Sequence, residues 1–252
     1  MRRLLIRPGA IGDFILSLPT LEAARADYTE LWAPRPVLPL VRFADATRAI
    51  IDTGIERVGV VDGAQVDALR QFDSIYSWYG TNHPEFREAV RGLPFTFFPA
   101  LPPGPGVPRI EVAPAPKQNI AIIHPFASAA SKRWPLGDFQ RVAAELGCPV
   151  RWLAGPEESL PQAERIDDLY ELACWLAAAR LYIGNDSGIS HLAAAVGTPT
   201  LAMFLTSDPQ IWAPRGAHTR ILQSPSVSAV VDLAHTLLRE HPAGLLKDPV
   251  AE

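Results

Sequence analysis

Cysteine and histidine are scarce in this chain of 252 residues, and neither sign of charge strongly dominates. Each of these features argues against a class of protein. The two cysteines and six histidines show neither the spacing of a zinc site nor that of a disulfide framework. The pair Asp167-Asp168 is not an Asp-x-Asp metal motif. A net charge of −4 gives no overall attraction for nucleic-acid phosphates. We therefore expect a protein of the reducing cytoplasm that holds no metal and binds no nucleic acid.

Long apolar runs are also missing. The N-terminal stretch MRRLLIRPGAIGDFILSLP is broken by Arg7, Pro8, Gly9, Gly12 and Asp13, so it lacks the continuous apolar region of a signal peptide. Hydrophobic residues make up 48% of the chain and charged residues 20%. Such a composition is typical of a globular chain that folds in water and does not span a bilayer.

Proline, in contrast, is abundant, and the 25 prolines mostly fall where short β-type runs or helical patterns end. Strand-like and helical segments alternate along the chain, which indicates parallel sheets. In the first half we predict strands at 4–7, 31–34, 57–62 and 74–80, with helices around 45–51, 65–72 and 84–91 between them. In the second half we predict strands at 119–125, 150–155, 181–185 and 199–205.

The segment from 99 to 116 is rich in Pro and Gly and has neither helical nor strand periodicity, as expected of a connector. We therefore predict an N-terminal Rossmann-like lobe over 1–105, a Pro-rich linker over 106–117 and a C-terminal Rossmann-like lobe over 118–252. Ligands of open α/β sheets bind outside the carboxyl ends of the strands. The chemistry is therefore expected in the loops that follow the strands, at a cleft between the lobes.

One such loop lies in IGNDSGISHLAAAVGTP, where a strand runs into Asp186-Ser187-Gly188 and a helix begins at once. Free backbone N–H groups and the helix dipole at such a start favour an anion, and glycine lets a phosphate approach the backbone. His191, on the first turns of that helix, would reach the same anion. Two other interpretations stay open: Asp186 or Ser187 is only a helix cap, and His191 is only packing.

Two further loops carry charged residues. In HPFASAASKRWP, small and hydroxyl residues precede Lys132, an arrangement suited to holding a diphosphate, although Lys132 as a solvated surface residue is the other interpretation. In RPGAIGDF, Asp13 lies at the start of a helix. It either complements the helix dipole or acts as a general base for an attacking hydroxyl. The glycines there do not have the spacing of a dinucleotide-binding motif.

Taken together, the Gly-Asp near the N-terminus, the Lys-x-Trp-Pro of the second lobe and NDSGISHLAAAVGTPT resemble glycosyltransferase family 9. These are the bacterial lipopolysaccharide heptosyltransferases, which use ADP-heptose. The resemblance implies the GT-B fold and an inverting, metal-independent transfer with no cofactor. It makes Asp13 the catalytic base, and it places Lys132 in both catalysis and donor binding. The other donor-site positions that it implies are Ser128, Glu157 in the AGPEE loop of 154–158, Asp186, Ser187, Gly188 and His191.

The sequence therefore predicts an enzyme that moves a sugar, expected to be heptose, from a nucleoside diphosphate to a hydroxyl of a saccharide or lipopolysaccharide-core acceptor. The alternative is a degenerate, non-catalytic nucleotide-sugar-binding protein, because the N-terminal lobe is short for the family. A nucleotide-sugar epimerase or hydrolase is a weaker rival. The expected location is the cytoplasm, with a peripheral contact at the inner face of the inner membrane left open by the nature of the family's acceptors.

Overall fold

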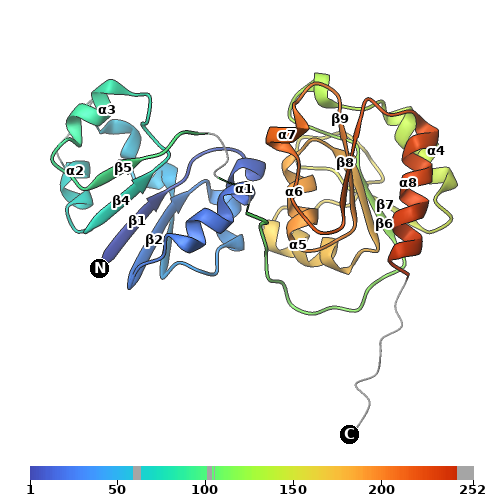
Figure 1. Ribbon diagram of the computed structural model, residues 1–252, viewed down its shortest axis with the longest axis horizontal. Coiled ribbons are helices and arrows are strands. Elements are labelled where there is room, and N and C mark those ends of the chain that lie inside the picture. The colour runs from blue at the N-terminus through green and yellow to red at the C-terminus, as the bar shows by residue number, and fades with distance from the viewer. Residues whose placement is uncertain (59–63, 101–103, 105, 243–252) are drawn as a thin grey trace, which may run out of the picture. The chain divides into compact units, whose positions relative to one another are not determined.

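The computed structural model describes residues 1–58, 64–100, 104 and 106–242. The chain divides into two compact units, Met1–Gly106 and Val107–Glu252. Each unit contains one five-stranded sheet, and every pair of neighbouring strands in both sheets is parallel (Figure 1). The predicted α/β class with two parallel sheets is confirmed.

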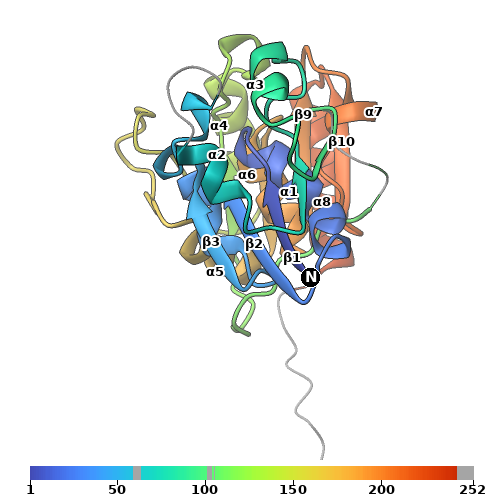
Figure 2. The ribbon, with the colours of Figure 1, turned by 90° about the vertical axis from the view of Figure 1, so that its left-hand side faces the viewer.

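In the N-terminal unit the strand order is β3-β2-β1-β4-β5, and β3, β2 and β1 lie side by side in Figure 2. The strands are β1 (Arg2–Ile6), β2 (Tyr28–Ala33), β3 (Ala46–Ala49), β4 (Ser74–Ser77) and β5 (Phe95–Phe97). The helices are α1 (Ile11–Ala23), α2 (Ala64–Leu69) and α3 (Pro84–Ala89), with 3₁₀ turns η1 (Arg35–Leu40), η2 (Ile50–Asp52) and η3 (Ile55–Arg57). Central β1 ends in three fully buried apolar residues, as expected of a strand covered on both faces.

In the C-terminal unit the order is β10-β9-β8-β6-β7. The strands are β6 (Ala121–His124), β7 (Val150–Trp152), β8 (Leu181–Asn185), β9 (Thr200–Phe204) and β10 (Thr219–Gln223). The helical elements are η4 (Ala130–Lys132), α4 (Leu136–Glu145), α5 (Leu169–Ala178), α6 (Gly188–Ala195), α7 (Pro209–Trp212) and α8 (Val227–Glu240). Helices α4 and α8 pack together on one face of the sheet and α5 and α6 on the other (Figure 1). Strands β6, β8 and β9 are therefore buried along their whole length.

Sequence periodicity misassigned one element of the N-terminal unit. The helix expected around 45–51 is strand β3 followed by η2. Pairing with β2 decides this, because the N–H of Asp45 donates to the Thr29 carbonyl (2.9 Å) and the Asp45 carboxylate accepts the Thr29 N–H (2.7 Å). Such tertiary pairing overrides a weak local preference. Of the strand expected at 57–62, residue 57 ends η3, and 59–62 lie outside the described residues.

The Pro-rich segment is attached to the C-terminal unit after its first residues. Ile110 is buried, and its N–H donates to the carbonyl of Ala195 at the end of α6 (3.0 Å). Within the segment, residues 101–103 and 105 lie outside the described part of the chain.

Candidate functional site

Four neighbouring loops of the C-terminal unit meet at the carboxyl edge of its sheet. They follow β9, β8, β6 and β7, which are consecutive in the sheet order. All strands are parallel, so these four loops emerge at the same edge, the usual position of a ligand site in such a fold. The predicted donor-site residues all lie on three of these loops or on the helix that begins there.

Asn185, the last residue of β8, fixes the loop after β6. Its side chain is fully buried. Its Oδ1 accepts the N–H of Trp134 (2.9 Å), and its Nδ2 donates to the carbonyl of Pro125 (2.9 Å). One side chain therefore ties both ends of the loop that carries Lys132 to the strand that carries Asp186. Sequence analysis did not single out Asn185, although its place at the end of a buried strand was visible.

Lys132 and Asp186 form an ion pair, with the ammonium Nζ 2.7 Å from the carboxylate Oδ2. The Asp186 side chain is 6% exposed and the Lys132 side chain 31%. Asp186 Oδ2 also accepts a hydrogen bond from the hydroxyl of Ser207 (2.6 Å), which follows β9. Lys132 is therefore not a freely solvated surface residue. It is a half-buried cation held at the edge of the sheet by two neighbouring loops.

The start of α6 provides backbone donors beside this pair. Ser187 is the N-cap residue, but its side chain makes no capping hydrogen bond, and the Asp186 carboxylate is directed to Lys132 and Ser207 instead. The first N–H groups of a helix lack partners within the helix, and the positive end of the dipole adds to their attraction for an anion. The arrangement suits a phosphate group at Gly188 better than a self-capped helix start.

Beneath this loop a buried tyrosine supports the backbone. The hydroxyls of Tyr182 and Ser190 lie 3.3 Å apart, and Ser190 donates to the carbonyl of Asn185 (2.5 Å). Burial raises the pKa of Tyr182 well above its ordinary value, so the phenol is neutral. Residue 184 must be glycine, since a Cβ there would lie only 2.4 Å from the Tyr182 hydroxyl oxygen.

A second hydrogen-bonded pair, His124 and Glu158, lies at the adjoining loop after β7. Nε2 of His124, the last residue of β6, is 2.9 Å from Oε2 of Glu158, and the Gly155 N–H donates to the same oxygen (2.6 Å). Burial raises the pKa of Glu158, but the hydrogen bonds from His124 and Gly155 outweigh it and leave the pKa below its ordinary value. Nδ1 of His124 is buried and has no hydrogen-bond partner in the described part of the chain.

The remaining predicted donor residues are placed as follows. Ser128 is exposed on the loop after β6, and Glu157 is exposed on the loop after β7, whereas its neighbour Glu158 is the glutamate that faces the sheet edge. His191 is buried on α6 at 5% exposure. Sequence reasoning chose Glu157 and passed over Glu158 and His124, because only the folded loop shows which glutamate turns inward.

Asp13 lies in the N-terminal unit, on the first turn of α1, after central strand β1. Its side chain is partly buried, and its Oδ2 accepts the N–H of Ala10 (3.2 Å). That hydrogen bond turns the carboxylate toward the helix start, at the carboxyl edge of the N-terminal sheet. Asp13 thus lies at the carboxyl edge of its sheet, as the four loops described above do in the C-terminal unit.

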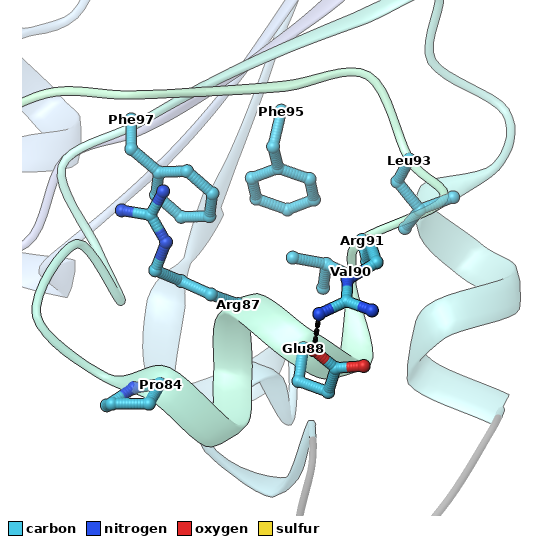
Figure 3. A pocket seen from close by; sticks show the side chains of 8 residues that line it. All are labelled: Pro84, Arg87, Glu88, Val90, Arg91, Leu93, Phe95 and Phe97. Atoms are coloured by element: carbon cyan, nitrogen blue, oxygen red, sulfur yellow. Dashed lines mark ion pairs between the residues drawn. The ribbon is translucent and has the colours of Figure 1, made fainter.

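Two hollows lie away from these residues. One, of about 570 Å³, lies between α3 and β5, where Arg87 stands 4.6 Å from the Phe97 ring centroid and Arg91 pairs with Glu88 (Figure 3). The other, of about 380 Å³, is lined in part by Lys117, Arg180 and His241. Lys117 and Arg180 there donate to backbone carbonyls near the ends of α5 and α8, so they act as helix-end partners.

The described residues contain no group of three or more His, Cys, Asp or Glu side chains placed to hold a metal ion. In the same part of the chain, no helix has the length and apolar character needed to cross a membrane.

The family profile described as glycosyltransferase family 9 (heptosyltransferase) matches residues 106–236. No curated protein sequence matches the chain. Among solved structures, the chain is similar to E. coli ADP-heptose lipopolysaccharide heptosyltransferase II, with a TM-score of 0.73, 16% identity, and coverage of 95% of this chain and 99% of that chain. A family 9 glycosyltransferase from Veillonella parvula DSM 2008 gives a TM-score of 0.72 at 17% identity, covering 95% of this chain and 97% of that one. E. coli heptosyltransferase WaaC with ADP gives 0.65 at 14% identity, covering 94% and 100%. At these identities the structural likeness establishes the fold.

Proposed function

Because the chain belongs to glycosyltransferase family 9, the heptosyltransferases, we propose that it transfers heptose from ADP-heptose to a hydroxyl of a saccharide or lipopolysaccharide-core acceptor, with inversion at the anomeric carbon. The observation that carries the proposal is the edge of the C-terminal sheet, where Lys132, Asp186 and the start of α6 converge. The structural neighbours include WaaC with ADP and with ADP-2-deoxy-2-fluoro heptose, which makes an ADP-sugar the donor to test first.

The donor site is proposed to hold the diphosphate between Lys132 and the free N–H groups at Ser187 and Gly188. A lysine ammonium is a point charge that binds phosphate oxygens well, and the helix start adds donors that need no reorganisation. Ser128 and His191 would supply further contacts to the phosphates, and Asp186 would accept hydrogen bonds from the sugar hydroxyls.

The loop after β7 is proposed to contact the nucleoside. Glu158, held as a carboxylate by His124 and Gly155, would accept hydrogen bonds from ribose hydroxyls, while exposed Glu157 would act at the rim. The lowered pKa of Glu158 keeps this acceptor charged at neutral pH.

In the proposed reaction, Asp13 takes the proton of the acceptor hydroxyl as its oxygen forms a bond to the anomeric carbon. The bond from that carbon to the diphosphate oxygen breaks, and its electron pair leaves with ADP. Lys132 and the α6 N-terminus stabilise the negative charge that develops on the leaving diphosphate. Attack from the face opposite the leaving group gives inversion. In this proposed step, Asp13 takes up the proton, and Lys132 and the α6 N-terminus balance the charge on the leaving diphosphate. The proposed step therefore uses no metal ion.

In the proposed arrangement, residues 1–105 carry the base and bind the acceptor, and residues 118–252 bind the donor. Residues 106–117 connect the two lobes. The proposed location is the cytoplasm, where a glycolipid acceptor would bring the protein into peripheral contact with the inner face of the inner membrane.

Calorimetric titration with ADP, GDP, UDP and ADP-heptose tests the donor site. We expect selective binding of the ADP species, weakened in Lys132→Ala. Lys117→Ala is the matched control, because this lysine of the same unit donates to the carbonyls of Ala177 and Ala179 at the end of α5. Selective binding of GDP or UDP would overturn the ADP assignment, and binding of none would overturn the donor site.

Turnover is tested with ADP-heptose and truncated lipopolysaccharide acceptors, with the product's anomeric configuration read by NMR. We expect inversion and loss of turnover in Asp13→Asn. Asp73→Asn is the control, since the Asp73 carboxylate also accepts a backbone N–H, that of Arg2 (2.6 Å), but at the amino end of β1. Donor binding without transfer to any acceptor would favour the non-catalytic binding protein. Unchanged turnover in Asp13→Asn would refute the assigned base.

A further inference from the structure

Arg7 is the largest fully buried side chain in the described part of the chain, at 2% exposure. It follows directly after β1, and its backbone N–H continues the pairing with β2 by donating to the Trp32 carbonyl (2.9 Å). A buried guanidinium is costly unless its donors are satisfied. The acceptors that satisfy Arg7 therefore indicate what the residue holds in place.

Most of those acceptors lie around Asp13, and Nη2 also donates a long hydrogen bond to the carbonyl of Ala100 (3.5 Å). Nη1 donates to the Pro8 carbonyl (2.7 Å), and Nη2 donates to the Asp13 carbonyl (3.1 Å). Nε donates to the hydroxyl of Ser17 (2.7 Å), which itself donates to the Asp13 carbonyl (2.7 Å). The guanidinium is thus hydrogen-bonded to the loop before Asp13, to the backbone of Asp13 and to the next turn of α1.

The acceptors are neutral oxygens, so the charge that faces Arg7 has to come from elsewhere. A Cβ placed on Gly9 would lie 3.1 Å from Oδ2 of Asp13 and 3.4 Å from Nη1 of Arg7, so the two charged groups flank the same glycine. Gly9 has a φ of +116°, a conformation that lets the chain turn between them without a side chain. Burial lowers the pKa of Arg7, and the Asp13 carboxylate raises it.

Helix α1 also needs an anchor at this end. Pro19 lies within it and has no N–H to donate to the carbonyl four residues earlier, that of Ile15. The residue before the helix is Ala10, whose side chain cannot cap. Besides the hydrogen bond from the Ala10 N–H to the Asp13 carboxylate (3.2 Å), the first turn is restrained by Arg7 and Ser17, which both donate to the Asp13 carbonyl.

We propose that Arg7 is a positioning residue for the reaction: its guanidinium fixes the backbone and, by its charge, the carboxylate of Asp13 in the geometry needed for proton abstraction. The proposal rests on the proposed function of Asp13. Lysine would not replace Arg7, because an ammonium lacks the planar fork that reaches four acceptors at once.

Arg3, on the strand β1 that precedes Arg7, provides a matched control. Its Nε donates to the hydroxyl of Ser74 (2.9 Å) and its Nη1 to the carbonyl of Ala24 at the end of α1 (2.8 Å). It therefore links β1 to α1 as Arg7 does, but at the opposite end of the helix from Asp13.

Steady-state turnover of ADP-heptose with a truncated lipopolysaccharide acceptor is the first measurement, on the full-length chain. Arg7→Lys is expected to lower kcat about 100-fold while the donor KM and ADP affinity stay within about 2-fold, because a small misplacement of the base affects only the chemical step. Arg3→Lys is expected to keep kcat within about 2-fold. A folded Arg7→Lys with wild-type kcat, or an equal loss in Arg3→Lys, would overturn the proposal.

Denaturant unfolding of Arg7→Met, Asp13→Asn and the double variant needs no substrate. We expect the two substitutions to be non-additive, with Asp13→Asn costing less when residue 7 is already Met, whereas the Arg3→Met and Asp13→Asn cycle is additive. Additivity in the Arg7 cycle would refute the coupling. If the wild type transfers no sugar but the coupling is found, the proposed function fails and the positioning proposal fails with it, although the Arg7–Asp13 interaction itself stands.

Discussion

The ion pair between Lys132 and Asp186 leads to opposite predictions for the ADP affinity when one or the other residue is replaced. The ammonium lies 2.7 Å from the carboxylate, so a diphosphate arriving at the start of α6 would have to share Lys132 with Asp186. Removing the cation should weaken ADP binding. Removing the carboxylate, by Asp186→Asn, should strengthen it, because the competing negative charge is gone and the amide oxygen can still accept the Ser207 hydroxyl.

The magnitudes follow from burial. A charge-assisted hydrogen bond contributes about 1.5 to 3 kcal/mol, but Lys132 is 31% exposed, so we take the lower end of that range. About 1.4 kcal/mol corresponds to a tenfold change in Kd, and Lys132→Met should weaken ADP binding roughly 10-fold. The pair is half buried, with a net contribution of about 1 kcal/mol, so Asp186→Asn should tighten ADP binding about 5-fold.

The assay is calorimetric titration of ADP against both variants and the double variant, with Lys117→Met as the control for removing a cation elsewhere in the unit. The titrations are repeated at high salt, where the gain in Asp186→Asn should shrink as screening increases. ADP lacks the sugar, so contacts from Asp186 to sugar hydroxyls do not enter the comparison.

Weaker ADP binding in Asp186→Asn would refute the reasoning, because it would mean that the carboxylate orients Lys132 for the phosphate more than it competes with it. Unchanged affinity in Lys132→Met would remove Lys132 from the diphosphate site altogether.

Two further predictions concern stability. Asn185→Ala leaves the Trp134 N–H and the Pro125 carbonyl without their partner. We expect the free energy of unfolding to fall by about 2 to 4 kcal/mol, which calorimetry would record as a Tm lower by roughly 8 °C. A Tm within about 2 °C of wild type would contradict the role of Asn185 as the link between loops. The pKa of Glu158 is lowered from 4.5, because hydrogen bonds from His124 and Gly155 outweigh burial, so its contribution to stability is present above about pH 4.5 and is lost as the pH falls through the lowered pKa. Urea unfolding between pH 6 and 3 should therefore show a shallower pH dependence in Glu158→Gln than in wild type, and identical slopes would count against the hydrogen bonds to Glu158.

Much of the fold could be predicted from local patterns. Strand β8 was expected at 181–185 and is observed there, and the helix that begins at Gly188 follows the Asn-Asp-Ser-Gly turn as predicted. Such strands are buried on both faces, so their continuous apolar runs are easy to recognise. Strand β3 was missed because it is only four residues long and its pairing partners in β2 lie 16 residues away in sequence.

The candidate site was predicted in part. Lys132, Asp186, Ser187 and Gly188 are brought to the same sheet edge, where their loops emerge side by side. Asn185, His124 and Glu158 lie within the quoted motifs but were given no role, because a buried Asn, a His at a strand end and one of two adjacent glutamates show no function from local sequence alone. Their importance depends on partners that are tens of residues away, such as Trp134 for Asn185 and Glu158 for His124.

The sequence by itself determined the alternation of strands and helices, the parallel sheets that follow from it and the loop motifs that identify the family, because these depend on local spacing of side chains. Only the tertiary structure decided that Lys132 pairs with Asp186, that Glu158 turns inward rather than Glu157, and that Arg7 lies buried against Asp13. Each of these arrangements depends on which charged side chains the folded protein buries and which opposite charges it places beside them. The free energy of burying a charged group is set by its surroundings in the fold and not by its position along the chain.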